Sequence, residues 1–125
     1  MSQLTLHLDQ TALQPGEELT GTLTWQTEVF TAQHLVINLF WFTRGKGSED
    51  LEVVNTIEQT LERPSGETRF SFRLPPSPWS YSGRLISIVW AVEAGLDEKG
   101  AADRVEFVSA PGGLELTSWQ NAETP

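Results

Sequence analysis

Apolar and polar residues alternate along most of this chain, and a period of two is typical of half-buried β-strands. Near Arg84–Ala94 one predicted face carries Ile86, Ile88, Trp90, Val92 and Ala94, and the other carries Ser87 and Glu93. The same rule predicts seven strands, at Gln3–Leu8, Glu17–Trp25, Gln33–Thr43, Leu51–Thr60, Thr68–Leu74, Arg84–Ala94 and Arg104–Val108. Short strands at this spacing favour an antiparallel β-sandwich.

Turn-forming residues separate the predicted strands. The sequence Gln14-Pro-Gly16 predicts a turn, Arg63–Gly66 a hairpin connection, and Arg44–Asp50 a flexible loop. Three prolines, at positions 75, 76 and 78, predict a stiff, extended crossing after the strand that ends at Leu74. We expect Gly95–Asp103 to form a hairpin loop, and no long helix is predicted.

The chain of 125 residues has the size of one domain, and it contains no cysteine to form disulfides. We expect the sandwich to occupy residues 1–110. Residues 111–125 are predicted to form a C-terminal extension, with an edge strand near Leu114–Ser118 and then a frayed tail.

The net charge of the chain disfavours some classes of binding partner. Eight Lys and Arg against seventeen Asp and Glu give −9, which disfavours nucleic acid and anionic lipid. We expect no membrane span, since no window approaches ~18 apolar residues, and no secretory signal in the first residues. A cytoplasmic location is expected, with which the absence of cysteine is compatible.

Two motifs carry a family resemblance. The first is Pro15, Gly16 and Glu17 followed by Gly21; the second comprises Phe70, Phe72, Leu74, Pro75, Pro78, Ser80, Tyr81, Gly83, Ile88, Trp90, Val92 and Ala94. In this order and spacing they resemble the N-terminal sandwich domain of the arrestin-like superfamily, over roughly Leu4 to Val108. The resemblance implies an all-β, antiparallel immunoglobulin-like or arrestin-like β-sandwich of about seven to eight strands.

The resemblance also implies a non-enzymatic scaffold that binds a protein partner, or a second copy of itself, through loops and sheet edges. In such folds the loop after the third strand inserts into partners, and its counterpart here is Thr43–Asp50, which carries Arg44 and Lys46. Trp79 and Tyr81, on the proline-rich crossing, are the second choice for partner binding. Each segment also has a simpler explanation, as a solvated hairpin or as a crossing pinned to the sheet. Most members pair two sandwiches, whereas this chain has room for one.

Five tryptophans in 125 residues is a high number. Trp25 and Trp90 are in phase with aliphatic neighbours, which predicts core positions. Leu35–Phe42 is apolar on both faces, and we expect the Ile37 and Trp41 face to be core. Whether the face with Val36, Phe40 and Phe42 is core or interface stays open at this point.

Catalytic chemistry is poorly represented, so we expect no enzyme, no cofactor, no metal and no small-molecule ligand. His7 and His34 fall in separate strands without a carboxylate motif, and a hydrolase would need a clustered base and nucleophile. A calcium site at Asp97, Glu98 and Asp103 lacks the twelve-residue loop signature. The alternative function is a carbohydrate-binding module, in which Trp41, Trp79, Tyr81 or Trp119 would stack on sugars.

Overall fold

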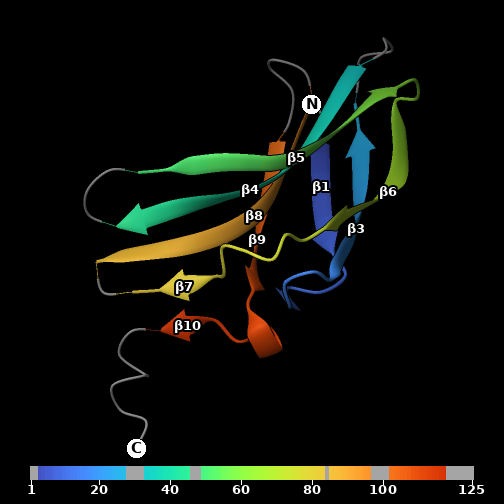
Figure 1. The fold of residues 1–125 in the computed structure, drawn as a ribbon. Helices are drawn as coiled ribbons and strands as arrows, with labels where there is room; N and C mark the ends of the chain where they lie inside the picture. Colours follow the sequence, from blue (N-terminus) through green and yellow to red (C-terminus); the bar gives the residue numbers. More distant parts are fainter. Residues whose placement is uncertain (1–2, 28–32, 46–48, 84, 97–101, 118–125) are drawn as a thin grey trace, which may run out of the picture.

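A computed structural model describes residues 3–27, 33–45, 49–83, 85–96 and 102–117. It is a sandwich of two β-sheets (Figure 1). Its elements are β1 (Gln3–Leu8), β2 (Ala12–Leu13), β3 (Glu18–Gln26), β4 (Gln33–Gly45), β5 (Leu51–Leu61), β6 (Ser65–Arg73), β7 (Tyr81–Ser82), β8 (Ile86–Leu96), β9 (Ala102–Ser109), a 3₁₀ turn (Pro111–Gly113) and β10 (Leu116–Thr117). The all-β sandwich that the sequence predicted is confirmed.

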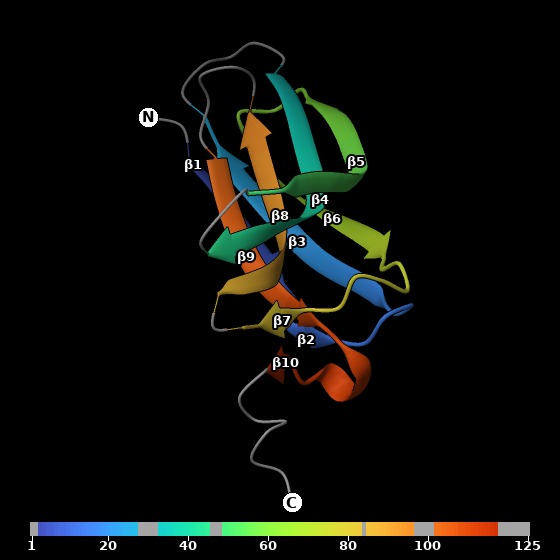
Figure 2. The same cartoon turned by 60° about the vertical axis from the view of Figure 1, so that its left-hand side comes forward.

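The small sheet has the order β1-β3-β6 and is antiparallel throughout. The large sheet has the order β10-β7-β8-β4-β5, and β9 also pairs with β8, next to β7 along the same side. Two short pairings, β2 with β9 and β10 with β7, are parallel, so the sandwich is mixed rather than purely antiparallel. Figure 2 shows β2, β7 and β10 gathered at one end of the molecule.

Several predicted boundaries were wrong by a few residues, because pairing continues past the sequence signal. Strand β4 runs to Gly45, which pairs with Ile86, so Arg44 and Gly45 belong to the strand and not to the predicted loop. Strand β6 begins at Ser65, which pairs with Gln26, so the predicted connection at Arg63–Gly66 is shorter. The crossing contains the short strand β7. The expected frayed tail after residue 117 lies outside the described residues.

The core lies between the two sheets and follows the predicted phase of each strand. Leu19 and Leu23 on β3 are fully buried against the large sheet, and Trp90 on β8 is fully buried as well. Trp25 is 9% exposed and donates from Nε1 to the carbonyl oxygen of Arg63 at 3.1 Å. Both tryptophans therefore occupy the core positions that the alternation predicted.

The first motif is tied to the start of the second by backbone hydrogen bonds. The Glu17 amide donates to the Gln14 carbonyl at 3.1 Å, which closes the predicted turn, and Gly16 has a φ of +85°. Gly16 donates to the Leu74 carbonyl at 3.1 Å, and Leu74 donates to the Glu17 carbonyl at 2.9 Å. This exchange fixes where the crossing leaves β6, so motifs distant in sequence form one structural unit.

The strands of the large sheet are longer than those of the small sheet. β4, β5 and β8 contain 13, 11 and 11 residues, against 6, 9 and 9 in β1, β3 and β6. In Figure 1 one end of the large sheet, where β7 lies, extends beyond the small sheet. We call the face toward the small sheet the inner face and the opposite one the outer face.

Candidate partner-binding surface

The predicted partner-binding residues do not form a single site. Arg44 pairs with Ser87 in the β4–β8 ladder, whereas Tyr81 pairs with Ile88 in the β7–β8 ladder. Directly paired residues share a face and successive residues alternate, so Arg44 lies on the outer face and Tyr81 on the inner face. Lys46 lies outside the described residues.

Trp79 lies in the crossing rather than in a strand. It is 42% exposed, and its indole Nε1 donates to the Pro76 carbonyl at 2.8 Å. This bond fixes the ring against its own segment. Tyr81 is half-buried, and its ring lies so close to Gly83 that a Cβ there would come within 2.6 Å of it. The aromatic residues of the crossing thus secure its course and leave part of Trp79 accessible.

The outer face carries two stacked phenylalanines beneath two arginines. The rings of Phe40 and Phe42 have centroids 5.9 Å apart and planes inclined by 28°. The Arg104 guanidinium carbon lies 5.0 Å from the Phe40 centroid and 5.5 Å from the Phe42 centroid, and that of Arg44 lies 5.3 Å from the Phe42 centroid. These are cation–π distances, so both cations stabilise an aromatic surface that faces away from the core.

Two glutamates hold these guanidinium groups in position. Arg104 donates from Nε and Nη2 to Oε1 of Glu93, at 2.9 and 2.7 Å. Arg44 donates from Nη2 to Oε2 of Glu106 at 2.7 Å. Both arginines are about half exposed, so each pair contributes roughly 0–1 kcal/mol to folding.

The burial of this face decides the question that the sequence left open. Phe40 is 3% exposed and Ala91, its partner on β8, is fully buried, yet both point away from the sandwich core. Phe42 is half-buried. Leu51 and Val53, opposite Phe42 and Phe40 on β5, are 60% and 47% exposed. The face is therefore a separate, partly open apolar surface, which we call the outer patch: Phe40, Phe42, Leu51 and Val53, with Arg44 and Arg104 above the rings.

Three hollows surround the outer patch, and the two arginines divide them. One is lined by Phe40, Leu51, Val53, Glu93 and Arg104, together with Asn38. The second lies between Arg104 and Arg44 over Phe42, and the third lies on the other side of Arg44, beside Val89 and Glu106. The outer patch thus combines depressions of mixed polarity with charged groups that are fixed in position.

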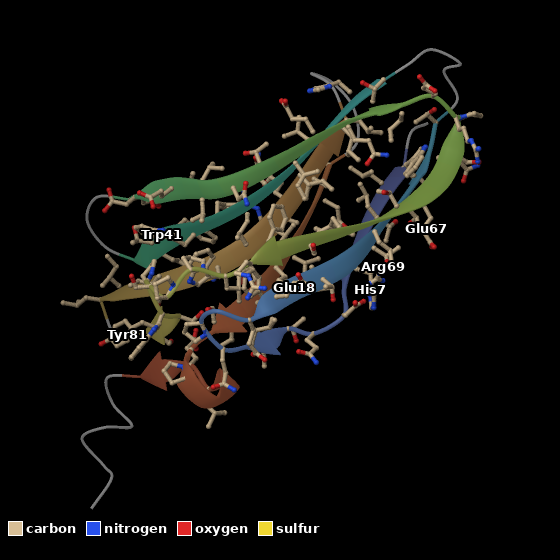
Figure 3. The ribbon with its side chains drawn as sticks, turned by 45° about the vertical axis from the view of Figure 1, so that its right-hand side comes forward. His7, Glu18, Trp41, Glu67, Arg69 and Tyr81 are labelled. Atoms are coloured by element: carbon tan, nitrogen blue, oxygen red, sulfur yellow. The ribbon has the colours of Figure 1, made fainter. Side chains whose placement is uncertain are left out.

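The inner face of the extended end carries a different group of residues. Trp41 and Tyr81 lie toward this end in Figure 3. Trp41 is half-buried, and its Nε1 is buried without a hydrogen-bond partner in the described part of the chain. Ring pairs among the described residues are Phe40–Phe42, Phe70–Phe72 and Trp90–Phe107. They include none of the aromatics at 41, 79 and 81, and Trp119 lies outside the described residues.

The histidines lie on exposed strand positions. His7 is exposed on β1, and His34, exposed on β4, has its Nε2 3.4 Å from Oε1 of Glu58 on the neighbouring strand. Asp9 accepts a 2.7 Å hydrogen bond from Arg69, which lowers the pKa of the Asp9 carboxyl. Figure 3 shows His7, Arg69 and Glu67 on the small sheet.

The described residues contain neither a cluster of metal-ligating side chains nor a helix that could span a membrane. They contain no group of three His, Asp or Glu side chains that could hold an ion. Of the three residues considered for a calcium site, Asp103 accepts a hydrogen bond from the Leu6 amide at 2.9 Å. Asp97 and Glu98 lie outside the described residues. The same part of the chain contains no helix of the length and hydropathy needed to cross a membrane.

Comparison with solved structures identifies the class of fold. Spo0M, a sporulation control protein from Bacillus subtilis, superposes with a TM-score of 0.65 at 19% identity, over 87% of this chain and 49% of Spo0M. A β-glucosidase from Listeria innocua bound to isofagomine gives a TM-score of 0.52 at 18% identity, over 93% of this chain and 16% of the enzyme. The chain thus spans about half of Spo0M and a small part of the glucosidase.

At these identities the likeness shows the fold alone, and it agrees with the β-sandwich that the two motifs implied. No family model and no curated protein matches the sequence.

Sequence reasoning missed Arg104 as a member of this surface. A signal was present, because β8 and β9 form a hairpin in which Arg104 pairs with Glu93. Glu93 was already assigned to the face opposite Trp90, so fixing the register of that hairpin would have placed Arg104 on the outer face.

Proposed function

We propose that this chain is a non-enzymatic protein-interaction module of arrestin-like type, which binds a partner protein through the outer patch. The observation that supports the proposal is an aromatic pair on the outer face, buried Phe40 and half-buried Phe42, with arginines fixed over it and exposed Leu51 and Val53 beside it. Aromatic residues and Arg are enriched at the centres of protein interfaces, where they supply most of the binding energy. Arg44, from the segment implied by the resemblance, belongs to this surface.

The proposal includes a cytoplasmic location and the absence of a bound cofactor. The lack of cysteine is compatible with a reducing compartment, and fractionation of the host cell checks the location. A sugar-binding role would place the site on the crossing instead, and the 42% exposure of Trp79 is the observation that favours it.

Site-specific photo-crosslinking in the native host tests the partner surface. A photoreactive phenylalanine analogue replaces Val89, which is half-buried on the outer face between β4 and β9. We expect crosslinks to one host protein from this position. The matched control is Ser71 on β6, which is exposed on the far side of the small sheet and should give none.

A third analogue at Trp79 separates the alternatives. Crosslinking from Trp79 but not from Val89 would place the partner surface on the crossing and contradict the proposal. Glycan binding that Trp79→Ala abolishes would favour the carbohydrate-binding alternative.

A further inference from the structure

Strand β5 forms an open edge of the large sheet. It ends the strand order and pairs with β4 alone, so among the described residues its second edge has no partner strand. Eight of its eleven residues are exposed, which leaves the backbone of that edge accessible. In Figure 1 β5 borders the sheet on the side away from β9. An open edge of this length is a template for pairing with another chain.

The ladder geometry shows which backbone groups point away from β4. The Thr43 amide donates to the Asp50 carbonyl at 2.9 Å, so the Asp50 backbone faces β4 and, by alternation, that of Leu51 faces outward. Beyond the bulge at Leu39 and Phe40, the Thr56 amide donates to the Asn55 side chain at 2.9 Å instead of to β4. Thr56, and with it Glu58 and Thr60, therefore presents its backbone outward.

Exposed side chains along this edge include two apolar residues at one end and two glutamates. Leu51 and Val53 extend the outer patch to the edge. Glu52 and Glu58 lie on the strand and are exposed, and the strand contains neither Lys nor Arg. The flanking Glu49, Asp50 and Glu62 are exposed as well. The open edge of the small sheet differs, because β6 carries Arg69 and Arg73 beside Glu67.

We infer that the outward edge of β5 binds an extended, basic segment of a partner protein as an added strand. Main-chain hydrogen bonds to the outward groups would supply affinity, and alternate side chains would supply selectivity. Apolar residues of the segment cover Leu51 and Val53, and Lys or Arg residues lie near Glu52 and Glu58. The inference rests on the proposed interaction function and adds the chemistry of the partner.

Charge favours this occupant over a second copy of the chain. Pairing two β5 edges brings together two molecules that each carry −9, and it places the glutamates of both strands in one ladder. Like charges close together in a sheet are destabilising. A basic segment meets the same residues with opposite charge, which also speeds association.

The test uses the full chain and synthetic ten-residue peptides. Glu52 lies on the inner face and Glu58 on the outer face, so one peptide carries Lys on both faces, at positions that can lie opposite these two residues, with Val and Thr between them. A second has Glu in place of each Lys, and a third is the basic peptide with N-methyl groups on alternate amides. Affinity is measured by anisotropy of labelled peptide, and amide hydrogen exchange locates the contact. We expect the basic peptide to slow exchange on β5 and not on β6, and to bind at least about ten-fold more tightly than the other two.

Protein variants separate backbone pairing from general attraction. Glu58→Lys should weaken the basic peptide about ten-fold, whereas the matched control Glu18→Lys, exposed on β3 of the small sheet and with the same change in charge, should leave its affinity within about two-fold. Thr60→Pro removes an outward amide without loss of a bond to β4, so it should fold and lose binding. The N-methylated peptide removes main-chain hydrogen bonds from the other side, so it tests backbone pairing with the unaltered protein.

The outcomes are distinct. Equal affinity for the basic and N-methylated peptides, or equal loss from Glu58→Lys and Glu18→Lys, overturns the inference in favour of unspecific attraction. Concentration-dependent protection of β5 without peptide overturns it in favour of a second copy. Crosslinking from Val89 with no peptide bound at β5 refutes this inference and leaves the proposed function standing. Peptide binding at β5 without any crosslink from Val89 supports this inference and contradicts the outer patch as the partner surface.

Discussion

Replacing Trp90 by alanine tests the strand phase on which the fold depends. The side chain is fully buried, its ring centroid lies 6.0 Å from that of Phe107, and its Nε1 donates to the Pro78 carbonyl at 2.9 Å. Removal of a buried aromatic side chain costs roughly 3–5 kcal/mol, because the cavity closes incompletely. Since domains of this kind unfold with about 5–15 kcal/mol, we expect Trp90→Ala to lose a large part of the stability.

The hydrogen bond can be separated from the packing. Trp90→Phe keeps an aromatic ring but leaves the Pro78 carbonyl without its donor, which should cost about 1–3 kcal/mol. Urea unfolding followed by far-UV circular dichroism measures both variants without relying on tryptophan fluorescence. With a slope of about 2 kcal/mol per molar urea, a loss of about 4 kcal/mol lowers the midpoint by about 2 M.

Trp79→Ala is the matched control, because Trp79 is 42% exposed and its one hydrogen bond is to its own segment. Its urea midpoint should correspond to a decrease of no more than about 1 kcal/mol in the free energy of unfolding. An unchanged midpoint for Trp90→Ala, or equal losses for the two alanine variants, would refute the assignment of Trp90 to the space between the sheets.

Two further predictions concern the small sheet. Gly21→Ala should destabilise the chain by about 1–3 kcal/mol in the same assay, because a Cβ at Gly21 would lie 2.5 Å from Cζ of Phe70 and 2.6 Å from the His7 carbonyl oxygen. A stabilised variant would show that the sheet relaxes at this point. Asp9→Asn should lower the melting temperature at pH 6, since the pKa of Asp9 is lower in the folded chain and its contribution is present above the unfolded value of about 3.9. That difference should shrink as the pH falls through the folded pKa, and a difference that does not change with pH would contradict the role of the Arg69 pair.

Strand positions and core phase were predictable because they depend on local alternation. Trp25 and Trp90 follow the same period as their aliphatic neighbours, and both are buried as expected. The turn at Gln14–Gly16 was predictable for a similar reason, since Pro and Gly restrict or permit particular backbone angles. These features need no knowledge of which strands become neighbours.

The arrangement of the candidate site was not predictable in the same way. Arg44 and Tyr81 fall on opposite faces of the large sheet because each pairs with a different residue of β8. Arg104 reaches Phe40 because β9 lies beside β8, which lies beside β4. Such positions depend on the registers of strands that are distant in sequence, and a shift by one residue would reverse every face.

The unequal lengths of the two sheets explain why some apolar residues on the inner face of the large sheet are exposed to solvent. Ile86 and Trp90 share one face of β8, yet Ile86 is 40% exposed and Trp90 is fully buried. The alternation is the same for both, and the difference arises because the small sheet does not extend over the end of β8 that carries Ile86. A solvent-exposed apolar face next to an open edge strand is the combination that protein partners use. In this fold the longer sheet therefore supplies both the open edge strand β5 and most of the exposed large apolar side chains that lie in strands.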